Sequence, residues 1–138
     1  MNRVVITGLG IVSSIGNSAK EVLGSLQTGK SGITSNADMI EYGFRSQVAG
    51  DIKLDVKDFV DKRTLRFMGP GAAYAHIAME QAIKDAGLEE NEISNFRTGL
   101  IAGSGGPSTS AMLAAHQTVL KSGAPKRIGP FAVPKCMS

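Results

Sequence analysis

The sequence has little from which a disulfide, a membrane span or an aromatic core could be built. It contains one cysteine and no tryptophan, and aromatic residues make up 5% of its 138 residues. A single cysteine cannot form an internal disulfide, which fits a reducing compartment. No apolar run approaches the length of a transmembrane helix, and the first residues lack a signal-peptide pattern. We therefore expect a cytoplasmic globular protein that does not associate with a membrane.

Acidic side chains are absent from the last third of the chain. Residues 1–92 have a net charge of −2, whereas residues 93–138 contain five basic residues and no acidic one, a net charge of +5. A basic region of this kind can attract an acidic partner, although a solvated surface is the simpler interpretation. The basic residues are scattered and few aromatic residues lie among them, so nucleic acid is not an expected partner.

Glycine is abundant, with 17 residues, and marks the ends of the predicted elements. Val4–Leu9 and Thr98–Ala102 are short apolar runs that lead into glycine, which predicts two buried strands. Caps and apolar spacing predict helices over about 19–28, 62–68, 72–86 and 110–121. The third of these has so many alanines on one face that we expect close packing against a neighbour. The proline-containing tail, residues 129–138, is predicted to be a loop.

The order of these elements predicts an α/β fold with a largely parallel sheet. Two or three strands form a thin sheet, and a parallel sheet normally needs cover on both faces. We therefore expect much of the fold to lie beyond Ser138 or in a partner.

Two glycine-rich segments are candidates for phosphate binding. Gly8–Gly10 resembles the start of a dinucleotide fingerprint, but Ser13 stands where the third glycine belongs. Gly103–Gly106 lacks the ending of a P-loop, and Ala102 excludes a nucleophile elbow around Ser104. A structural turn is the favoured interpretation of the first segment, and a close approach of the backbone that of the second.

The titratable residues give no catalytic or metal-binding pattern. Cys136 has only Lys135 as a cationic neighbour in sequence, so a buried, inert thiol is the favoured interpretation. His76 and His116 lie on predicted helices without a nucleophile or second ligand at useful spacing. We expect neither a metal nor another cofactor.

Six segments occur in an order that is more specific than any of them alone: Arg3–Gly16, Gly29–Ile33, Leu65–Met68, Glu80–Leu88, Thr98–Gly106 and Ile128–Ser138. Together they resemble the β-ketoacyl-acyl-carrier-protein synthases, a family of thiolase-fold condensing enzymes. Within that family the segment Gly103–Pro107 is most similar to the type I branch, because type II enzymes tend to carry a bulkier residue at the position of Gly106.

The resemblance implies an α/β, thiolase-like αβαβα layered fold and a homodimer. Residues 1–138 would form the N-terminal part of the synthase N-terminal domain, with its C-terminal part absent. The implied reaction is fatty-acid elongation by decarboxylative Claisen condensation of malonyl-acyl carrier protein with an enzyme-bound acyl group. The family's catalytic cysteine, two histidines and lysine follow the stretch that matches here. We therefore expect no catalytic residue in this chain, and Cys136, His76 and His116 correspond to none of the four.

The resemblance also implies binding roles. Gly106 matches a position that lines the acyl-chain pocket, where a missing side chain leaves room. Met137 matches a position near the dimer interface that reaches the partner's pocket. Two basic groups match surfaces for acyl- and malonyl-loaded acyl carrier protein, the second less closely than the first: Lys62, Arg63 and Arg66, then Lys126 and Arg127. From spacing alone, the first group shares a helix face whose simplest interpretation is solvation.

Two other functions are compatible with the residues. The first is a stand-alone carrier-binding or dimerisation module that has no catalytic residues. The second, less favoured, is a nucleotide-binding α/β domain that uses Gly8–Gly10.

Overall fold

The computed structural model describes residues 3–137 and divides the chain into two compact units. The first unit contains the chain up to Leu54 together with Ala78–Leu88, and the second contains Asp55–Ile77 and the chain from Glu89 onwards. Helix α4, Pro70–Ala86, contributes its first half to the second unit and its second half to the first. Within residues 3–137 no helix is both long and apolar enough to cross a membrane.

The first unit contains α1 (Ala19–Gln27), β1 (Ile33–Ser35), α2 (Ala37–Glu41) and β2 (Val48–Gly50). The two strands pair antiparallel, with Ile33 opposite Gly50. Helix α1 was predicted from its N-terminal cap, and the cap is present: Ser18 Oγ accepts the Glu21 N–H at 3.3 Å. The Glu21 carboxylate accepts the N–H of Asn17 at 2.8 Å, one residue further back than a capping box requires.

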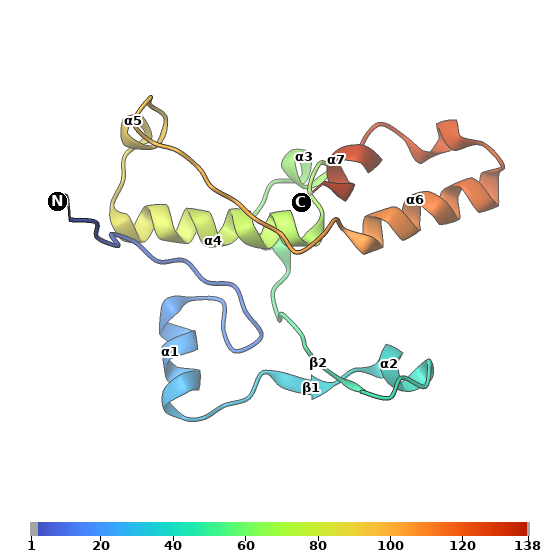
Figure 1. Ribbon diagram of the computed structural model, residues 1–138, viewed down its shortest axis with the longest axis horizontal. Coiled ribbons are helices and arrows are strands. Elements are labelled where there is room, and N and C mark those ends of the chain that lie inside the picture. The colour runs from blue at the N-terminus through green and yellow to red at the C-terminus, as the bar shows by residue number, and fades with distance from the viewer. Residues whose placement is uncertain (1–2, 138) are drawn as a thin grey trace. The chain divides into compact units, whose positions relative to one another are not determined.

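The segment before α1 lies along the second half of α4 (Figure 1). A Cβ on Gly8 would overlap the carbonyl oxygen of Ala82, and one on Gly10 would overlap that of Ala78. Between them, Leu9 N–H donates to Asp85 Oδ2 at 2.9 Å. The predicted close packing of the alanine face is thereby confirmed, because only glycine lets two backbones approach this closely.

The two predicted buried strands are the main error of the sequence prediction. In the part of the chain that the structure describes, neither Val4–Leu9 nor Thr98–Ala102 pairs with another strand. The side chains of Val4, Ile6 and Ile101 are 94%, 91% and 98% exposed. A strand owes its ladder of hydrogen bonds and much of its burial to neighbouring strands, so an apolar run without a partner strand lacks that ladder and leaves its side chains exposed. The sheet among the described residues has two antiparallel strands rather than a parallel arrangement.

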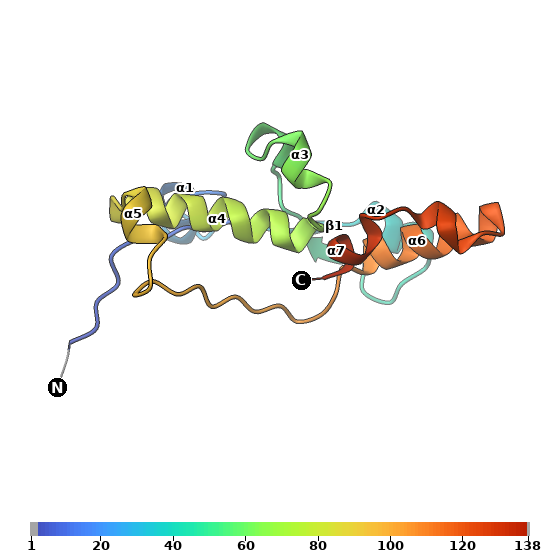
Figure 2. The same ribbon diagram turned by 90° about the horizontal axis from the view of Figure 1, so that it is seen from above.

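The second unit is mainly helical. It contains η1 (Val56–Asp58), α3 (Lys62–Leu65), α5 (Glu90–Ile93), α6 (Thr109–Ser122), η2 (Pro125–Ile128) and α7 (Ala132–Cys136), together with the first half of α4. Figure 2 shows η2 and α7 beside α6, which both elements contact. Val60, Ala73 and Ile77 are its buried apolar residues. Gly123, with φ of +65°, ends α6 in the left-handed conformation that its position predicts.

The tail, residues 129–138, was predicted to be a loop, and this is wrong for residues 132–136, which form α7. The element η2, Pro125–Ile128, ends just before the tail. Pro134 is the third residue of α7, a position whose N–H has no partner within the helix in any case. Proline in the first turn therefore does not prevent this helix.

Candidate functional site

Gly106 and Met137 line the same pocket, although they are 31 residues apart in sequence. The pocket has a volume of about 340 Å³ and lies within the second unit. Its remaining wall comes from residues 69–72, where α4 begins, and from Ser104 and residues 107–110, which lead into α6. The structure thus brings together the two residues for which the sequence predicted substrate binding.

Ser108 connects the elements around this pocket. Its N–H donates to the carbonyl oxygen of Cys136 at 3.2 Å, which ties the start of α6 to the end of α7. Its hydroxyl accepts the N–H of Ala111 at 3.3 Å and so caps α6. Gly69 fits between the same elements, since a Cβ there would lie 2.7 Å from the Lys135 carbonyl oxygen and 3.0 Å from Ser108 Cβ.

The glycine-rich segment is open rather than tightly packed. A Cβ on Gly103, Gly105 or Gly106 would meet no described atom within 4 Å. The predicted close approach to this backbone is therefore not found within residues 3–137. The Ser104 hydroxyl donates to the Gly106 carbonyl oxygen at 2.8 Å, which closes a tight local turn. The absence of a side chain at Gly106 leaves free volume at the pocket wall.

The pocket is suited to binding rather than to chemistry. Its lining contains small residues, the thioether of Met137 and hydroxyl groups. Helices α4 and α6 both begin at its wall, and helix N-termini carry partial positive charge. Among residues 3–137, no histidine, carboxylate or cysteine side chain lines it. A second pocket of about 400 Å³ shares Gly69, Pro70 and Ser110 with it and is bounded by Phe131.

The remaining candidates for chemistry stand on separate elements. Cys136 is the last residue of α7, His76 is in α4 and His116 is in α6. The cysteine is half-buried, rather than fully buried as its inert interpretation supposed. Within residues 3–137, no group of three or more His, Cys, Asp or Glu side chains is placed to hold a metal ion.

The first basic cluster forms the short helix α3. Asp61 caps this helix by accepting the N–H groups of Arg63 and Thr64 at 2.8 and 3.1 Å. The side-chain hydrogen bond from Thr64 and these backbone N–H groups lower the pKa of the Asp61 carboxyl, and the charge of Arg66 adds to the effect. Lys62 and Arg63 are in the helix, Arg66 is its helical C-cap, and all three are exposed. The predicted common helical turn is confirmed.

Arg66 has an aromatic partner that the sequence did not reveal. Its guanidinium carbon lies 5.6 Å from the centroid of the Phe131 ring. The Phe67 ring meets the same ring edge-on, with centroids 5.1 Å apart and planes at 90°. Phe131 lies three residues after η2, the element that contains the exposed Lys126 and Arg127. In the sequence, Phe131 is simply an aromatic residue between Pro130 and Pro134, and this pattern does not predict a contact with Arg66.

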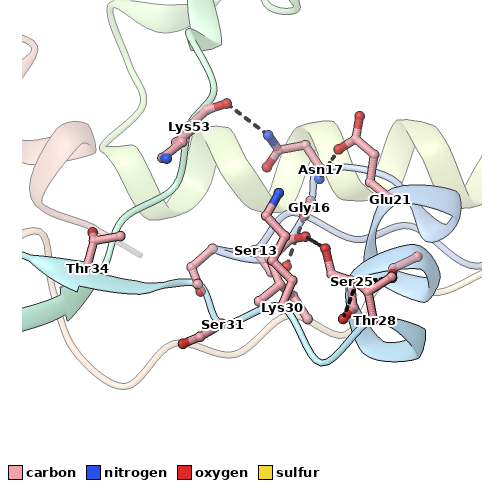
Figure 3. Close-up of a pocket in the computed structure, with 14 residues that line it drawn as sticks. Ser13, Gly16, Asn17, Glu21, Ser25, Thr28, Lys30, Ser31, Thr34 and Lys53 are labelled. Atoms are coloured by element: carbon pink, nitrogen blue, oxygen red, sulfur yellow. Dashed lines mark hydrogen bonds between the residues drawn. The ribbon is translucent and has the colours of Figure 1, made fainter.

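A third pocket, of about 480 Å³, lies in the first unit and contains no predicted site residue (Figure 3). Several of its polar side chains form hydrogen bonds with the backbone. Ser13 and Ser25 hydroxyls donate to the carbonyl oxygens of Gly16 and Ile15 at 2.9 and 2.6 Å. The Asn17 amide donates to the Lys53 carbonyl oxygen at 3.0 Å. These hydrogen bonds stabilise the loop that precedes α1. The polar lining of this pocket therefore has a structural role.

Gly8 and Gly10 pack against a helix, which gives these two glycines a structural role. Both face the backbone of α4, at Ala82 and Ala78. The favoured interpretation of these glycines as structural is confirmed, although they serve helix packing rather than a turn. A nucleotide site at this segment has no support in the geometry.

Comparison with known proteins identifies the family. The model of the β-ketoacyl synthase N-terminal domain matches residues 1–138. The chain belongs to the β-ketoacyl synthase family. It is 50% identical over 138 residues to 3-oxoacyl-[acyl-carrier-protein] synthase 1 of Haemophilus influenzae, and 48% identical over 139 residues to the Escherichia coli K12 protein of that name. Each alignment covers 100% of this chain and 34% of the relative, so the chain spans about a third of their length.

Solved structures of ketosynthases show the same fold. A β-ketoacyl synthase from Burkholderia phymatum STM815 matches 99% of this chain and 34% of its own, with a TM-score of 0.79 and 30% identity. The ishigamide ketosynthase/chain length factor matches 96% and 33%, with a TM-score of 0.81 and 25% identity. The predicted α/β thiolase-like fold is confirmed. The chain matches the N-terminal domain of the family.

Proposed function

We propose that this chain is the first part of a longer β-ketoacyl-acyl-carrier-protein synthase, an acyltransferase of fatty-acid biosynthesis. Its reaction would be the decarboxylative Claisen condensation of malonyl-acyl carrier protein with an enzyme-bound acyl group. The observation that carries this proposal is the 50% identity to a 3-oxoacyl-[acyl-carrier-protein] synthase 1 over the whole chain. Such similarity makes the type I branch the preferred assignment.

The proposed reaction needs a thiolate that holds the acyl group and groups that stabilise negative charge. Loss of CO₂ from the malonyl thioester leaves a carbanion, which attacks the acyl thioester and expels the enzyme thiolate. We assign these steps to residues outside this chain, because Cys136, His76 and His116 lie on three different elements and none lines the pocket of Gly106. Residues 1–138 would supply binding surfaces, and no cofactor is needed for this chemistry.

The pocket between Gly106 and Met137 is our candidate for the acyl-chain site. Its thioether and small side chains suit an alkyl chain, and the open space beside Gly106 gives such a chain room. Met137 is 66% exposed, so its side chain is available to a second subunit. We propose a cytoplasmic homodimer in which Met137 lies at the interface and contacts the partner's acyl chain.

The basic residues are our candidate for the surface that receives acyl carrier protein. One exposed helical turn contains Lys62, Arg63 and Arg66. The element η2 of the same unit contains Lys126 and Arg127. An acidic carrier would be attracted to such a surface by long-range electrostatics. The docking of carriers loaded with acyl and malonyl groups would bring both substrates to one enzyme.

The pocket assignment is tested by Gly106→Ile in the complete polypeptide that carries this chain. A four-carbon side chain at the wall should reduce turnover of long acyl chains at least tenfold while short chains remain substrates. Gly105→Ile is the matched control, because Gly105 is the neighbouring residue and does not line the pocket. Competition between acyl-carrier substrates of increasing length measures the effect. An identical chain-length profile in both variants would remove Gly106 from the acyl site.

A further inference from the structure

Phe131 receives two contacts from the turn that ends α3. The Arg66 guanidinium lies over its face, with 5.6 Å between Cζ and the ring centroid. Phe67 approaches the same ring at 90° with a centroid separation of 5.1 Å, a favourable edge-to-face geometry. Arg66 itself is exposed and belongs to the first basic cluster. The exposed guanidinium of this cluster is therefore stacked on a ring from a distant part of the sequence.

Phe131 is itself well anchored. It is half-buried and bounds the pocket of about 400 Å³ in the second unit. Its carbonyl oxygen accepts the Lys135 N–H at 3.1 Å, at the start of α7. An aromatic ring has two side-chain torsions, whereas arginine has several, so the ring restricts the arginine rather than the reverse.

Arg66 also has an acidic neighbour. Asp61, the cap of α3, has a pKa that is lowered mainly by Thr64 and to a smaller degree by the charge of Arg66. A guanidinium that is free to rotate can turn towards this carboxylate, which would weaken its attraction for an acidic partner. Stacking on Phe131 keeps the guanidinium against a ring that lies three residues after η2, the element that contains Lys126 and Arg127.

We propose that Phe131 is a positioning residue of the basic docking surface: it holds Arg66 in place before an acidic carrier protein binds. This inference rests on the proposed function and adds a residue that does not itself carry charge. A preorganised arginine loses less side-chain freedom on binding. The Phe131 ring thus raises the affinity for the acidic partner by restricting the side chain of Arg66.

The test is Phe131→Leu in the complete polypeptide, with Phe131→Tyr as the matched control. Leucine keeps an apolar side chain at the pocket but removes the ring face, whereas tyrosine retains it. At low salt we expect acyl carrier protein to bind about two- to fivefold more weakly to Phe131→Leu, the value of one exposed cation–π contact. The KM for the carrier should rise with kcat unchanged, and Phe131→Tyr should match the original protein.

A double-mutant cycle separates positioning from simple loss of stability. Arg66→Ala should weaken binding less in the Phe131→Leu background than in the original protein, because part of its contribution is already lost. Lys62→Ala should have the same effect in both backgrounds. Arg66→Lys gives a second route if Phe131→Leu does not fold: it keeps the charge, loses the planar stack and should also weaken binding.

Additive effects of Arg66→Ala and Phe131→Leu, or unchanged binding by Phe131→Leu and Arg66→Lys, would overturn the inference. The proposed docking function is tested separately by charge reversal of Lys62, Arg63 and Arg66. If that reversal leaves carrier affinity at low salt unchanged, the docking assignment itself fails. If it weakens binding while Phe131→Leu does not, only the role of Phe131 is lost.

Discussion

Two glycine-rich segments follow apolar runs in this chain, and their surroundings are opposite. Gly8 and Gly10 face the backbone of α4 so closely that a Cβ on either would overlap a carbonyl oxygen. Gly103, Gly105 and Gly106 have open space around them, with no described atom within 4 Å of an added Cβ. In the first segment glycine permits contact between backbones, and in the second it leaves volume unfilled.

The difference explains why one sequence signature has two structural outcomes. The sequence favoured a structural role for the first segment, which is confirmed, and a close backbone approach for the second, which is not found within residues 3–137. What separates the two is the partner. The face of α4 opposite Gly8 and Gly10 offers Ala78, Ala82 and Ala86, which are small enough for contact. Among residues 3–137, no helix face packs against Gly103, Gly105 and Gly106 in this way.

The largest expected effect is that of Gly10→Ala. The added methyl group would overlap the Ala78 carbonyl oxygen and would lie 2.9 Å from Ala82 N, so the segment must move away from α4. The N–H groups of Leu9 and Ile11 would then lose Asp85 and Gln81, their acceptors at 2.9 and 3.1 Å. We expect a loss of about 3 kcal/mol or more in the free energy of unfolding, measured by denaturant titration.

Gly103→Ala is the matched control for this substitution. It adds the same methyl group where nothing lies within 4 Å, and it should change stability by less than about 0.5 kcal/mol. Equal losses in the two variants would show that the contrast between the packed and the open segment does not exist in solution.

An intermediate effect is expected from Gly69→Ala, which tests the wall of the pocket that contains Gly106. Its Cβ would lie 2.7 Å from the Lys135 carbonyl oxygen and 3.0 Å from Ser108 Cβ. A small shift of α7 can relieve these contacts, so we expect a loss of about 1–2 kcal/mol. The same shift would displace Met137 and should raise the KM for acyl substrates. If stability falls while the KM for acyl substrates does not change, the packing at Gly69 does not control substrate binding in this pocket.

Local signals in the sequence predicted the helices better than the strands. The caps Ser18 and Gly123 and the first-turn Pro70 each act within a few residues, and the helices that they bound are present. Strand pairing depends on partners far away in sequence. Val4–Leu9 and Thr98–Ala102 have strand-like composition but no partner strand among the described residues. The short helix α5 was missed because its cap is a glutamate, Glu89, whose partner Glu92 completes a capping box without serine or threonine.

The candidate site shows the same division between local and distant information. The common turn of Lys62 and Arg66 followed from spacing, because α3 is local. The meeting of Gly106 and Met137 required the fold, and in the sequence only family resemblance pointed to both residues. Phe131 was not predicted, because its contact with Arg66 joins residues that are 65 positions apart.

Apart from the control, the smallest expected effect has the opposite sign and comes from an open glycine in the same unit as Gly10. Gly24 lies within α1, and an added Cβ would meet nothing within 4 Å. Alanine restricts the unfolded chain more than glycine does and has a higher helix propensity, so Gly24→Ala should stabilise the protein by about 0.5–1 kcal/mol. The midpoint of thermal unfolding measures the gain. A destabilising result would mean that a neighbour fills the space beside Gly24, and the difference between packed and open glycines would then have to be redrawn for the first unit.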